Sequence, residues 1–410
     1  MKKLEKSVPV IRFKGFSDAW EQRKVSDYAI NTYGGGTPKT NVPEYWSGAI
    51  PWIQSSDLLI SNLFNVIPKK YITELAVKSS ATKFIPANSI AIVSRVGVGK
   101  LVFMPFEYTT SQDFLSLSNL QVDSNFGVYS IYMMLQKELK NIQGTSIKGI
   151  TKTDLLEKNI NKPSSREEQQ KIGGFFKQLD NTITLHQRKL DALKQMKKAF
   201  SQQIFPENNR KKPKMRFTSF YEEWEQRKIG EYGYFYYGKS APKWSVAQDA
   251  ATPCVRYGEL YTKFGPEIDI VHSYTNIDKS NLKFSSGNEV LVPRVGENPL
   301  DFANCSWLSI SNVAIGEMIS VYNTEQYPLF IAYYFRSKMK YEFAKRVEGG
   351  NVSNLYYSYL EDILISVPSI EEQNKIAEFL NKIDITINLL QNKLDRIKEL
   401  KKAYLQNMFI

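Results

Sequence analysis

The sequence contains a long internal repeat, which restricts the possible folds more than any other feature. Residues 9–24, PVIRFKGFSDAWEQRK, return as residues 213–228, PKMRFTSFYEEWEQRK, at a shift of 204 positions (213 − 9 = 204). The same shift places Asp180 on Asp384. Solenoid repeats span only about 20–50 residues, so a unit of this length is a duplicated domain with a duplicated helix. The chain is therefore predicted to have internal pseudo-two-fold symmetry, which suits a partner such as duplex DNA.

Each copy ends in a segment that is predicted to form a long helix. Residues 165–168 (SREE) and 369–372 (SIEE) closely follow a proline and match the capping box, in which serine caps the N3 amide and glutamate reaches back. No proline interrupts the segment that follows either box. Helices are therefore expected over 165–204 and 369–409, each roughly 55–60 Å long.

Apolar residues in both helices recur at alternating steps of four and three, which is the heptad seam of a coiled coil. The two seams match at the shift of 204, so each helix is the natural partner of the other, and antiparallel pairing is expected. His186, Lys197 and Lys401 also fall on the seam, and we interpret them as packing or register residues, with the lysines snorkelling. The predicted seam positions are Ile172, Leu179, Ile183, Leu190 and Leu193, with Ile376, Ile383, Ile387, Leu394 and Ile397.

The rest of each copy reads as a folded domain that contains strands. Short runs rich in β-branched residues, such as residues 89–96 and 289–295, alternate with Gly, Pro, Ser and Asn breaks. This pattern predicts mixed α/β or mostly β domains, and we expect a mixed α+β class for the whole chain. The predicted order is a domain over 1–163, a helix over 164–206, a domain over 207–368 and a helix over 369–410.

The composition narrows the class of function. A formal net charge of +12 suggests a polyanionic partner, DNA or RNA first, with a merely basic surface as an equal alternative. Two cysteines and two histidines leave no disulfide framework, CxxC site or His-rich metal site. Residues 1–7 lack the apolar stretch of a signal peptide, and no apolar run approaches a membrane helix, so a cytoplasmic protein is expected. The sequence has no HExxH, GxSxG or Asn-Pro-Pro-Tyr motif, which favours a binding subunit over an enzyme.

Several short polar motifs recur in both domains. Residues 34–39 (GGGTPK) correspond to 238–243 (GKSAPK), where glycine permits close approach to a phosphate and lysine supplies a donor. An ordinary Gly-Pro turn is the alternative. Residues 50–58 and 252–260 share an apolar frame but differ in their polar tips, as a surface that reads base edges would, although simple drift remains open.

The order of these motifs resembles the specificity (S) subunit of type I restriction–modification systems. Each variable domain is followed by a helix that opens on Pro-Ser and then Glu-Gln-x-x-Ile, and GGTP lies near the start of the first domain. The Phe-x-x-x-Trp-Glu-x-x-x-Leu/Ile motif of the family appears over residues 16–25, where Val25 takes the last position, and over residues 220–229. The likeness covers essentially the whole chain, but residues 238–242 (GKSAP) depart from GGTP.

This resemblance implies two target recognition domains held apart by an antiparallel coiled coil. Each domain would read one half of a split, asymmetric site in double-stranded DNA. The partners would be two modification subunits, which hold S-adenosylmethionine and methylate adenine, and restriction subunits, which use ATP and Mg. The chain itself would bind no cofactor, carry out no catalysis and contact no membrane.

The resemblance also selects residues for contact with DNA. The expected contacts are Thr37, Lys39, Gln54, Ser55, Arg95, Lys100 and Lys148 in the first copy, and Lys239, Ser240, Lys243, Arg256, Tyr257, Arg294 and Asn351 in the second. Three alternatives stay open: a specificity subunit of another restriction–modification type, a coiled-coil scaffold that binds DNA without sequence preference, and an enzyme in its own right.

Overall fold

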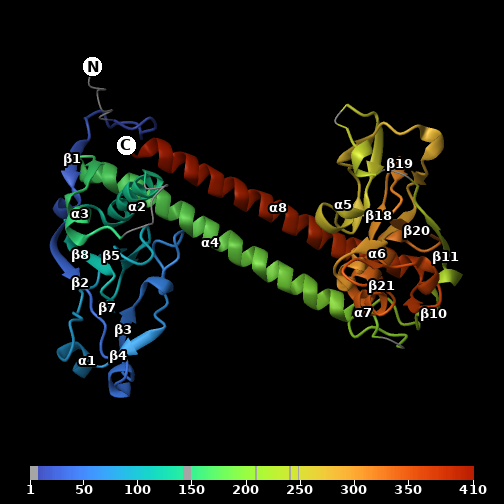
Figure 1. Cartoon of the computed structure of the whole chain (residues 1–410), viewed down its shortest axis with the longest axis horizontal. Helices are drawn as coiled ribbons and strands as arrows, with labels where there is room; N and C mark the ends of the chain where they lie inside the picture. The colour runs from blue at the N-terminus through green and yellow to red at the C-terminus, as the bar shows by residue number, and fades with distance from the viewer. Residues whose placement is uncertain (1–7, 142–148, 208–209, 240–241, 248) are drawn as a thin grey trace. The chain divides into compact units, whose positions relative to one another are not determined.

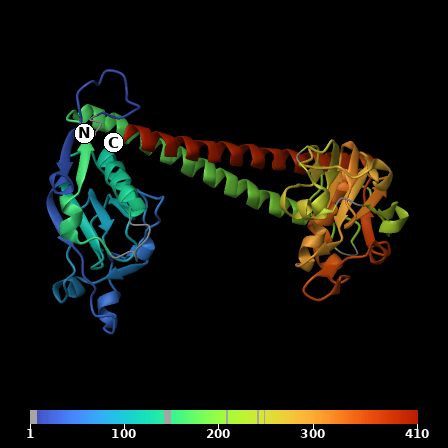
Figure 2. The same ribbon diagram turned by 45° about the horizontal axis from the view of Figure 1, so that its top comes forward.

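The computed structural model describes residues 8–141, 149–207, 210–239, 242–247 and 249–410. The chain packs as two units, residues 1–187 with 392–410 and residues 188–391, which we describe separately. The long helices are α4 (Arg166–Gln203) and α8 (Ile370–Met408), within one residue of the expected bounds. In each unit the first turns of one long helix lie beside the last turns of the other (Figures 1 and 2).

Besides a strand pair next to the long helix, the domain of unit 1 contains two sheets. The larger sheet has the antiparallel order β2-β8-β5-β6 and the smaller one the order β4-β3-β7. Their strands are β2 (Ala29–Gly34), β8 (Phe114–Leu120), β5 (Ser89–Val93), β6 (Leu101–Met104), β4 (Lys70–Ile72), β3 (Ile50–Ile53) and β7 (Thr109–Thr110). The helices of this domain are α1 (Glu74–Lys78), α2 (Ser124–Asn141) and α3 (Lys152–Glu157).

Strand β5 is an unbroken apolar run because both of its faces are buried. Ile90 and Ile92 belong to the core that also contains Phe126 of α2. Ala91, between them in sequence, belongs to a second core on the opposite face, which also contains Phe114. Successive side chains of a strand point to opposite faces, so both faces of a central strand must be apolar.

The domain of unit 2 has a larger set of strands. A five-stranded sheet has the order β11-β20-β16-β18-β13, a four-stranded sheet the order β14-β12-β19-β15 and a three-stranded sheet the order β17-β22-β21. Their strands are β11 (Gly233–Tyr237), β20 (Ile319–Thr324), β16 (Glu289–Pro293), β18 (Ser306–Leu308), β13 (Glu267–Ile268), β14 (Ser273–Thr275), β12 (Thr252–Val255), β19 (Ser311–Ile315), β15 (Phe284–Ser286), β17 (Val295–Gly296), β22 (Ser353–Asn354) and β21 (Glu348–Gly349). The helices are α5 (Tyr257–Thr262), α6 (Pro328–Lys338) and α7 (Lys340–Ala344).

A repeated strand pair joins the beginning of each domain to its end. In unit 1, β1 (Glu21–Lys24) is antiparallel to β9 (Asn159–Lys162), which leads into α4. In unit 2, β10 (Glu225–Lys228) is antiparallel to β23 (Leu364–Val367), which leads into α8. Both first strands have the sequence EQRK. Each domain is therefore closed by backbone hydrogen bonds next to its helix.

A buried ion pair reinforces each closure. Arg12 donates to the carboxylate of Glu168 through Nε at 2.7 Å and Nη2 at 2.8 Å. Arg216 donates to Glu372 in the same way, at 2.7 Å for both bonds. Each glutamate side chain is 1% exposed. We expected these glutamates to complete capping boxes by accepting from a backbone amide at the start of the helix. This expectation is wrong, because each glutamate accepts from an arginine, whose two charged N–H groups are stronger donors than a backbone amide.

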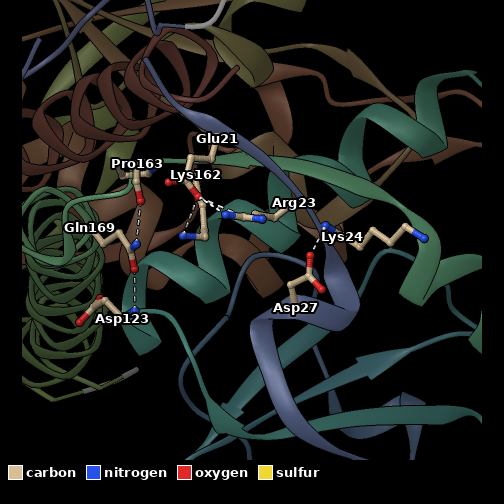
Figure 3. A network of polar contacts seen from close by, with 8 residues as sticks. All are labelled: Glu21, Arg23, Lys24, Asp27, Asp123, Lys162, Pro163 and Gln169. Carbon is tan, nitrogen blue, oxygen red and sulfur yellow. Dashed lines mark hydrogen bonds and ion pairs between the residues drawn. The ribbon is translucent and has the colours of Figure 1, made fainter. Parts of the chain in front are cut away.

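The serine half of each capping box is present, and the next glutamine extends it. The amide of Glu168 donates to Ser165 Oγ at 3.3 Å. Gln169 donates to the carbonyl of Pro163 at 2.8 Å and accepts from the amide of Asp123, just before α2, at 2.9 Å (Figure 3). In unit 2, Gln373 makes the same pair of bonds, to the carbonyl of Pro368 and from the amide of Tyr327. We call these strand pairs and the Arg–Glu and Gln contacts the frame.

The two long helices are held in register by ion pairs that repeat with exchanged roles. In unit 1, Asp180 of α4 pairs with Lys401 of α8. In unit 2, Asp384 of α8 pairs with Lys197 of α4 at 2.5 Å. Such an exchange is the mark of a two-fold contact. The expectation that these lysines snorkel is wrong, because each reaches a carboxylate from the partner helix.

The order of contacts gives the direction of the helices. In unit 1, Phe176 packs against Phe409, with ring centroids 5.7 Å apart, and Asp180, further along α4, meets the earlier Lys401. Residue numbers therefore rise along α4 as they fall along α8, so the helices are antiparallel. The duplicated mixed α+β fold with paired long helices, expected from the sequence, is confirmed.

The seam side chains face away from solvent to different degrees. Four are buried: Ile172, Leu190, Ile376 and Leu394. Six are half-buried: Leu179, Ile183, Leu193, Ile383, Ile387 and Ile397. Leu185 and Leu389, which lie off the seam, are 66% and 64% exposed. His186 bonds locally, with Nδ1 3.0 Å from the carbonyl oxygen of Thr182.

Within the described ranges, no helix is both long and apolar enough to cross a membrane.

We expect the protein to lose much of its stability when one partner of the Arg12–Glu168 pair is removed. Arg12→Ala would leave Glu168 as an unpaired charge in a buried site, which costs about 3–5 kcal/mol of unfolding free energy. Arg23→Ala is the matched control, because Arg23 pairs with Glu21 on the surface, where the side chains are 50% and 37% exposed. Denaturant unfolding should separate the two variants, and equal midpoints would contradict the role of the pair.

We expect the hydroxyl of Tyr129 to contribute to the loss of stability of unit 1 at alkaline pH. It donates to Asp180 at 2.5 Å, and burial, followed by the charge of that carboxylate, holds its pKa well above the ordinary value of 10. Because the unfolded chain loses this proton first, stability must fall as the pH rises above about 10. Tyr129→Phe should therefore give a shallower decline between pH 9 and 11. The same is expected of Tyr333→Phe in unit 2, because Tyr333 donates to Asp384 at 2.8 Å and burial, followed by the charge of Asp384, raises its pKa. Stability curves parallel to the wild type would contradict this.

Candidate nucleic-acid interface

The glycine loop of unit 1 packs against the protein's own backbone. The amide of Gly36 donates to the carbonyl of Thr110 at 2.9 Å, and Trp52 Nε1 donates to the carbonyl of Gly36 at 3.0 Å. A Cβ on Gly35 would lie 2.1 Å from the carbonyl oxygen of Ser111, so only glycine fits there. The close approach that these glycines permit is therefore internal.

Two predicted contact residues follow this loop at the surface. Thr37 donates to the side-chain oxygen of Gln112 at 2.5 Å, and Lys39 is exposed. The turn after β3 brings together three more. Lys100 Nζ donates to the carbonyl of Ser55 at 3.1 Å, and Gln54 precedes Ser55 on the same turn. The Lys100 ammonium thus supports the turn that presents Gln54.

A cavity of about 690 Å³ lies beside this turn, between residues 94–98 and 149–152. Arg95 lines it and is exposed. Lys152 also lines it, and a Cβ on Gly34 would lie 2.5 Å from Lys152 Nζ, so the first glycine of the loop leaves room for that ammonium. Lys148 precedes the cavity but lies outside the described residues.

Lys152 makes no ion pair within the described residues, although the charge of Asp113 acts, as the smallest of three effects, to raise its pKa. Burial first, and the charge of Arg95 second, lower the pKa of Lys152. No ion pair of either side chain occurs within the described residues. Two cations at one cavity create a site that favours an anion. We call Arg95, Lys152 and the cavity face 1.

Sequence reasoning missed Lys152, although a signal was present. Lys152 is the first residue of α3, capped by Thr151, whose side chain accepts from the amide of Asp154. A cation at a helix N-terminus opposes the helix dipole, so a lysine there is unfavourable for folding alone. The sequence Thr-Lys-Thr-Asp, in which a threonine can cap a helix whose first residue is a lysine, could therefore have marked Lys152 as a functional candidate.

Unit 2 places aromatic rings around the equivalent arginine. The Cζ of Arg294 lies 4.5 Å from the ring centroid of Tyr237 and 5.3 Å from that of Tyr356. Tyr237 also packs against Tyr357, with centroids 4.6 Å apart. Both distances from Arg294 are within the range of cation–π attraction. We call Tyr237, Arg294 and Tyr356 face 2.

The two faces occupy the same place in the repeat. At a shift of 205 (356 − 151 = 205), Thr151 and Lys152 correspond to Tyr356 and Tyr357. Gly149 lies against Arg95, since a Cβ there would be 2.9 Å from the Arg95 Cα, and Leu355 donates to the carbonyl of Arg294 at 2.8 Å. In both units the segment before the frame strand therefore packs beside the arginine.

The other predicted residues of unit 2 are spread over its surface. Lys239, Lys243, Tyr257 and Asn351 are exposed, Arg256 is half-buried, and Ser240 lies outside the described residues. Arg256 is the N-cap residue of α5. Trp244, which the sequence did not single out, is 82% exposed and adjacent to Lys243. An exposed tryptophan beside a lysine suits stacking on a nucleic acid.

No group of three His, Cys, Asp or Glu side chains within the described part of the chain could hold a metal ion. Both cysteines, Cys254 and Cys305, are buried and free. Burial raises the pKa of the Cys254 thiol to about 11, which keeps it protonated and unreactive at neutral pH. The polar chemistry of both faces thus comes from cations, hydroxyls and amides.

Comparisons with known proteins agree with this arrangement. The type I restriction enzyme MjaIX specificity subunit of Methanocaldococcus jannaschii is 24% identical over 403 residues, covering 93% of this chain and 90% of that protein. The type I restriction enzyme EcoR124I/EcoR124II specificity subunit of Escherichia coli is 35% identical over 170 residues, covering 37% and 40%. The crystal structure of a type I restriction–modification S subunit from M. genitalium shares the fold, with a TM-score of 0.63, 14% identity and coverage of 98% and 99%.

A family model accounts for both copies of the repeat. The type I restriction modification DNA specificity domain matches residues 17–195 and again residues 221–399. Each match includes one domain, its frame strands and glutamine, and most of the following helix, while Arg12 and Arg216 lie just before the matched ranges. The chain therefore belongs to the family of type I restriction–modification DNA specificity subunits, and it carries the family's domain twice.

Proposed function

We propose that this chain recognises a two-part, asymmetric site in double-stranded DNA, and that each domain reads one half. The observation that carries the proposal is one frame repeated around two unlike faces. The Arg–Glu pairs, the glutamine contacts and the EQRK strands recur almost atom for atom. Faces 1 and 2 share an arginine but differ in its neighbours. Because faces 1 and 2 lie at equivalent positions of the repeat but differ in chemistry, they would read two different half-sites.

Face 1 would combine a phosphate anchor with a base reader. Partial burial disfavours the charged form of Lys152 and lowers its pKa. A phosphate close to the ammonium would stabilise the charged form. Arg95 is exposed at the same cavity and has the fork that binds base edges. Gln54 and Ser55, on the turn that Lys100 supports, would extend this contact.

The contacts of unit 2 would rely more on aromatic rings. Arg294 lies with Tyr237 and Tyr356, while Tyr257 and Trp244 add exposed rings elsewhere. Lys239, Lys243 and Asn351 would contribute donors to phosphates or bases. The net charge of +12 would supply the attraction to the phosphate backbone that does not depend on sequence.

We propose that the catalysis lies in partner proteins. Two modification subunits would hold S-adenosylmethionine and methylate adenine, and restriction subunits would use ATP and Mg for translocation and cleavage. The relatives support this assignment, because they are named as specificity subunits of type I restriction enzymes. The chain's own task would be to choose the sequence at which its partners act.

Mapping methylated adenines at base resolution tests this function. Cells that express a type I modification subunit together with this chain should show a new two-part motif with an unspecified spacer. Cells that express the modification subunit alone should lack it. The contrary result is no new motif from this chain, when the same modification subunit methylates DNA with another specificity chain.

A further inference from the structure

Arg294 differs from most arginines of unit 2, because no carboxylate or carbonyl holds its side chain. Arg227 donates to Glu225, Arg346 donates to Glu342, and Arg336 donates to the carbonyl of Cys305. Within the described residues, the side chain of Arg294 makes neither an ion pair nor a hydrogen bond, and its Nε is buried without an acceptor. Buried donors are nearly always paired, so this guanidinium is an incomplete hydrogen-bonding group.

Two rings restrict the orientation of that guanidinium. Tyr237 ends β11, and Tyr356 lies two residues after β22, so the rings come from two separate segments of the domain. Tyr237 is fixed by Tyr357, and Tyr356 by Tyr359 at a centroid distance of 6.1 Å. Stacking occupies the faces of a guanidinium but leaves its N–H donors, which lie in its plane, free to bind. A side chain restrained in this way loses little entropy when it binds.

Among the residues that the structure describes, no carboxylate forms an ion pair with Arg294. Lys283 donates to the carbonyl of Tyr237 at 2.8 Å and lies 5.1 Å from the ring of Tyr236. The charge of Arg294 itself acts to lower the pKa of the Tyr237 hydroxyl, while burial, the larger effect, raises it. Both cations thus adjoin Tyr237, but the lysine has an acceptor and the arginine has none within the described residues, so a ligand could supply one.

We propose that Arg294 reads a guanine in the half-site of unit 2 by donating two N–H groups to O6 and N7 of that base. This inference rests on the proposed function. A restrained, planar fork matches the two acceptors that guanine presents in the major groove. The same fork also matches a phosphate, so the experiments below are chosen to separate a base contact from a phosphate contact.

The test uses the full chain with its modification subunits. In methylation maps, Arg294→Ala should make one guanine position of one half-site degenerate and leave the other half-site unchanged. In competition binding, the preference for guanine there should fall by about 5- to 150-fold. Arg294→Gln should move the preference toward adenine, because an amide matches N6 and N7 of adenine.

A modified base separates a base contact from a phosphate contact. Replacing that guanine by 7-deazaguanine removes the N7 acceptor, so wild-type binding should weaken while binding of Arg294→Ala should not change further. Tyr356→Phe keeps the ring and should keep the preference, whereas Tyr356→Ala should reduce it. Lys279→Ala, at an exposed site of the same domain, should leave the motif and the 7-deazaguanine effect as in the wild type.

Three results would overturn the inference. One is an unchanged motif in Arg294→Ala with binding weakened equally for all sequences and a smaller salt dependence, which would indicate a phosphate contact. Another is an equal effect of 7-deazaguanine on the wild type and Arg294→Ala. A third is a wild-type half-site without guanine. If the wild type gave no two-part motif at all, the proposed function itself would fail. Arg294→Lys provides a second variant should the alanine variant not fold.

Discussion

The buried pairs Arg12–Glu168 and Arg216–Glu372 are the contacts on which the attachment of each domain to its helix depends. A carboxylate that is 1% exposed is stable only with a matched donor, and in both units the donor comes from the segment that precedes the domain. The glutamate comes from the first turn of the helix that follows the domain. The two ends of the domain are thus bound together at the helix, and the frame strands continue this closure. The residues between the ends can change without loss of the frame.

The exchanged pairs Asp180–Lys401 and Asp384–Lys197 extend the same principle to the helices. A contact in which each partner plays both roles fixes an antiparallel register and is self-complementary. The faces do not follow this symmetry. Where unit 1 has Thr151 and Lys152, unit 2 has Tyr356 and Tyr357, and the arginine of each face therefore meets different neighbours. The frame and the helix ion pairs thus repeat in both units, while the two faces differ. This combination suits a protein that selects one asymmetric DNA sequence.

The sequence predicted the repeat, the helices and the seam because they depend on local periodicity and capping, which a single chain displays directly. It could not predict the partner of Glu168, since Arg12 lies far away in sequence, and a capping role for glutamate is the usual local interpretation. The register role of the seam lysines was predicted correctly, but snorkelling was wrongly expected of them, because their carboxylate partners lie on the other helix. The face residues Arg95 and Arg294 could be selected from the repeat, and the cap signal could have marked Lys152, but the place of Lys152 beside Gly34 and the rings beside Arg294 depend on how the chain folds back on itself.

The account's central claim is that the frame is constant and each face alone determines one half of the site. A chimera tests it directly: residues 25–158, between the frame strands of unit 1, are replaced by residues 229–363, so that both frames carry the second domain. Adenine methylation mapped in cells that contain this chimera and its modification subunits should reveal a symmetric motif, in which the half-site of unit 2 occurs twice in inverted orientation. A folded, methylation-competent chimera that still produced the original asymmetric motif would contradict the account.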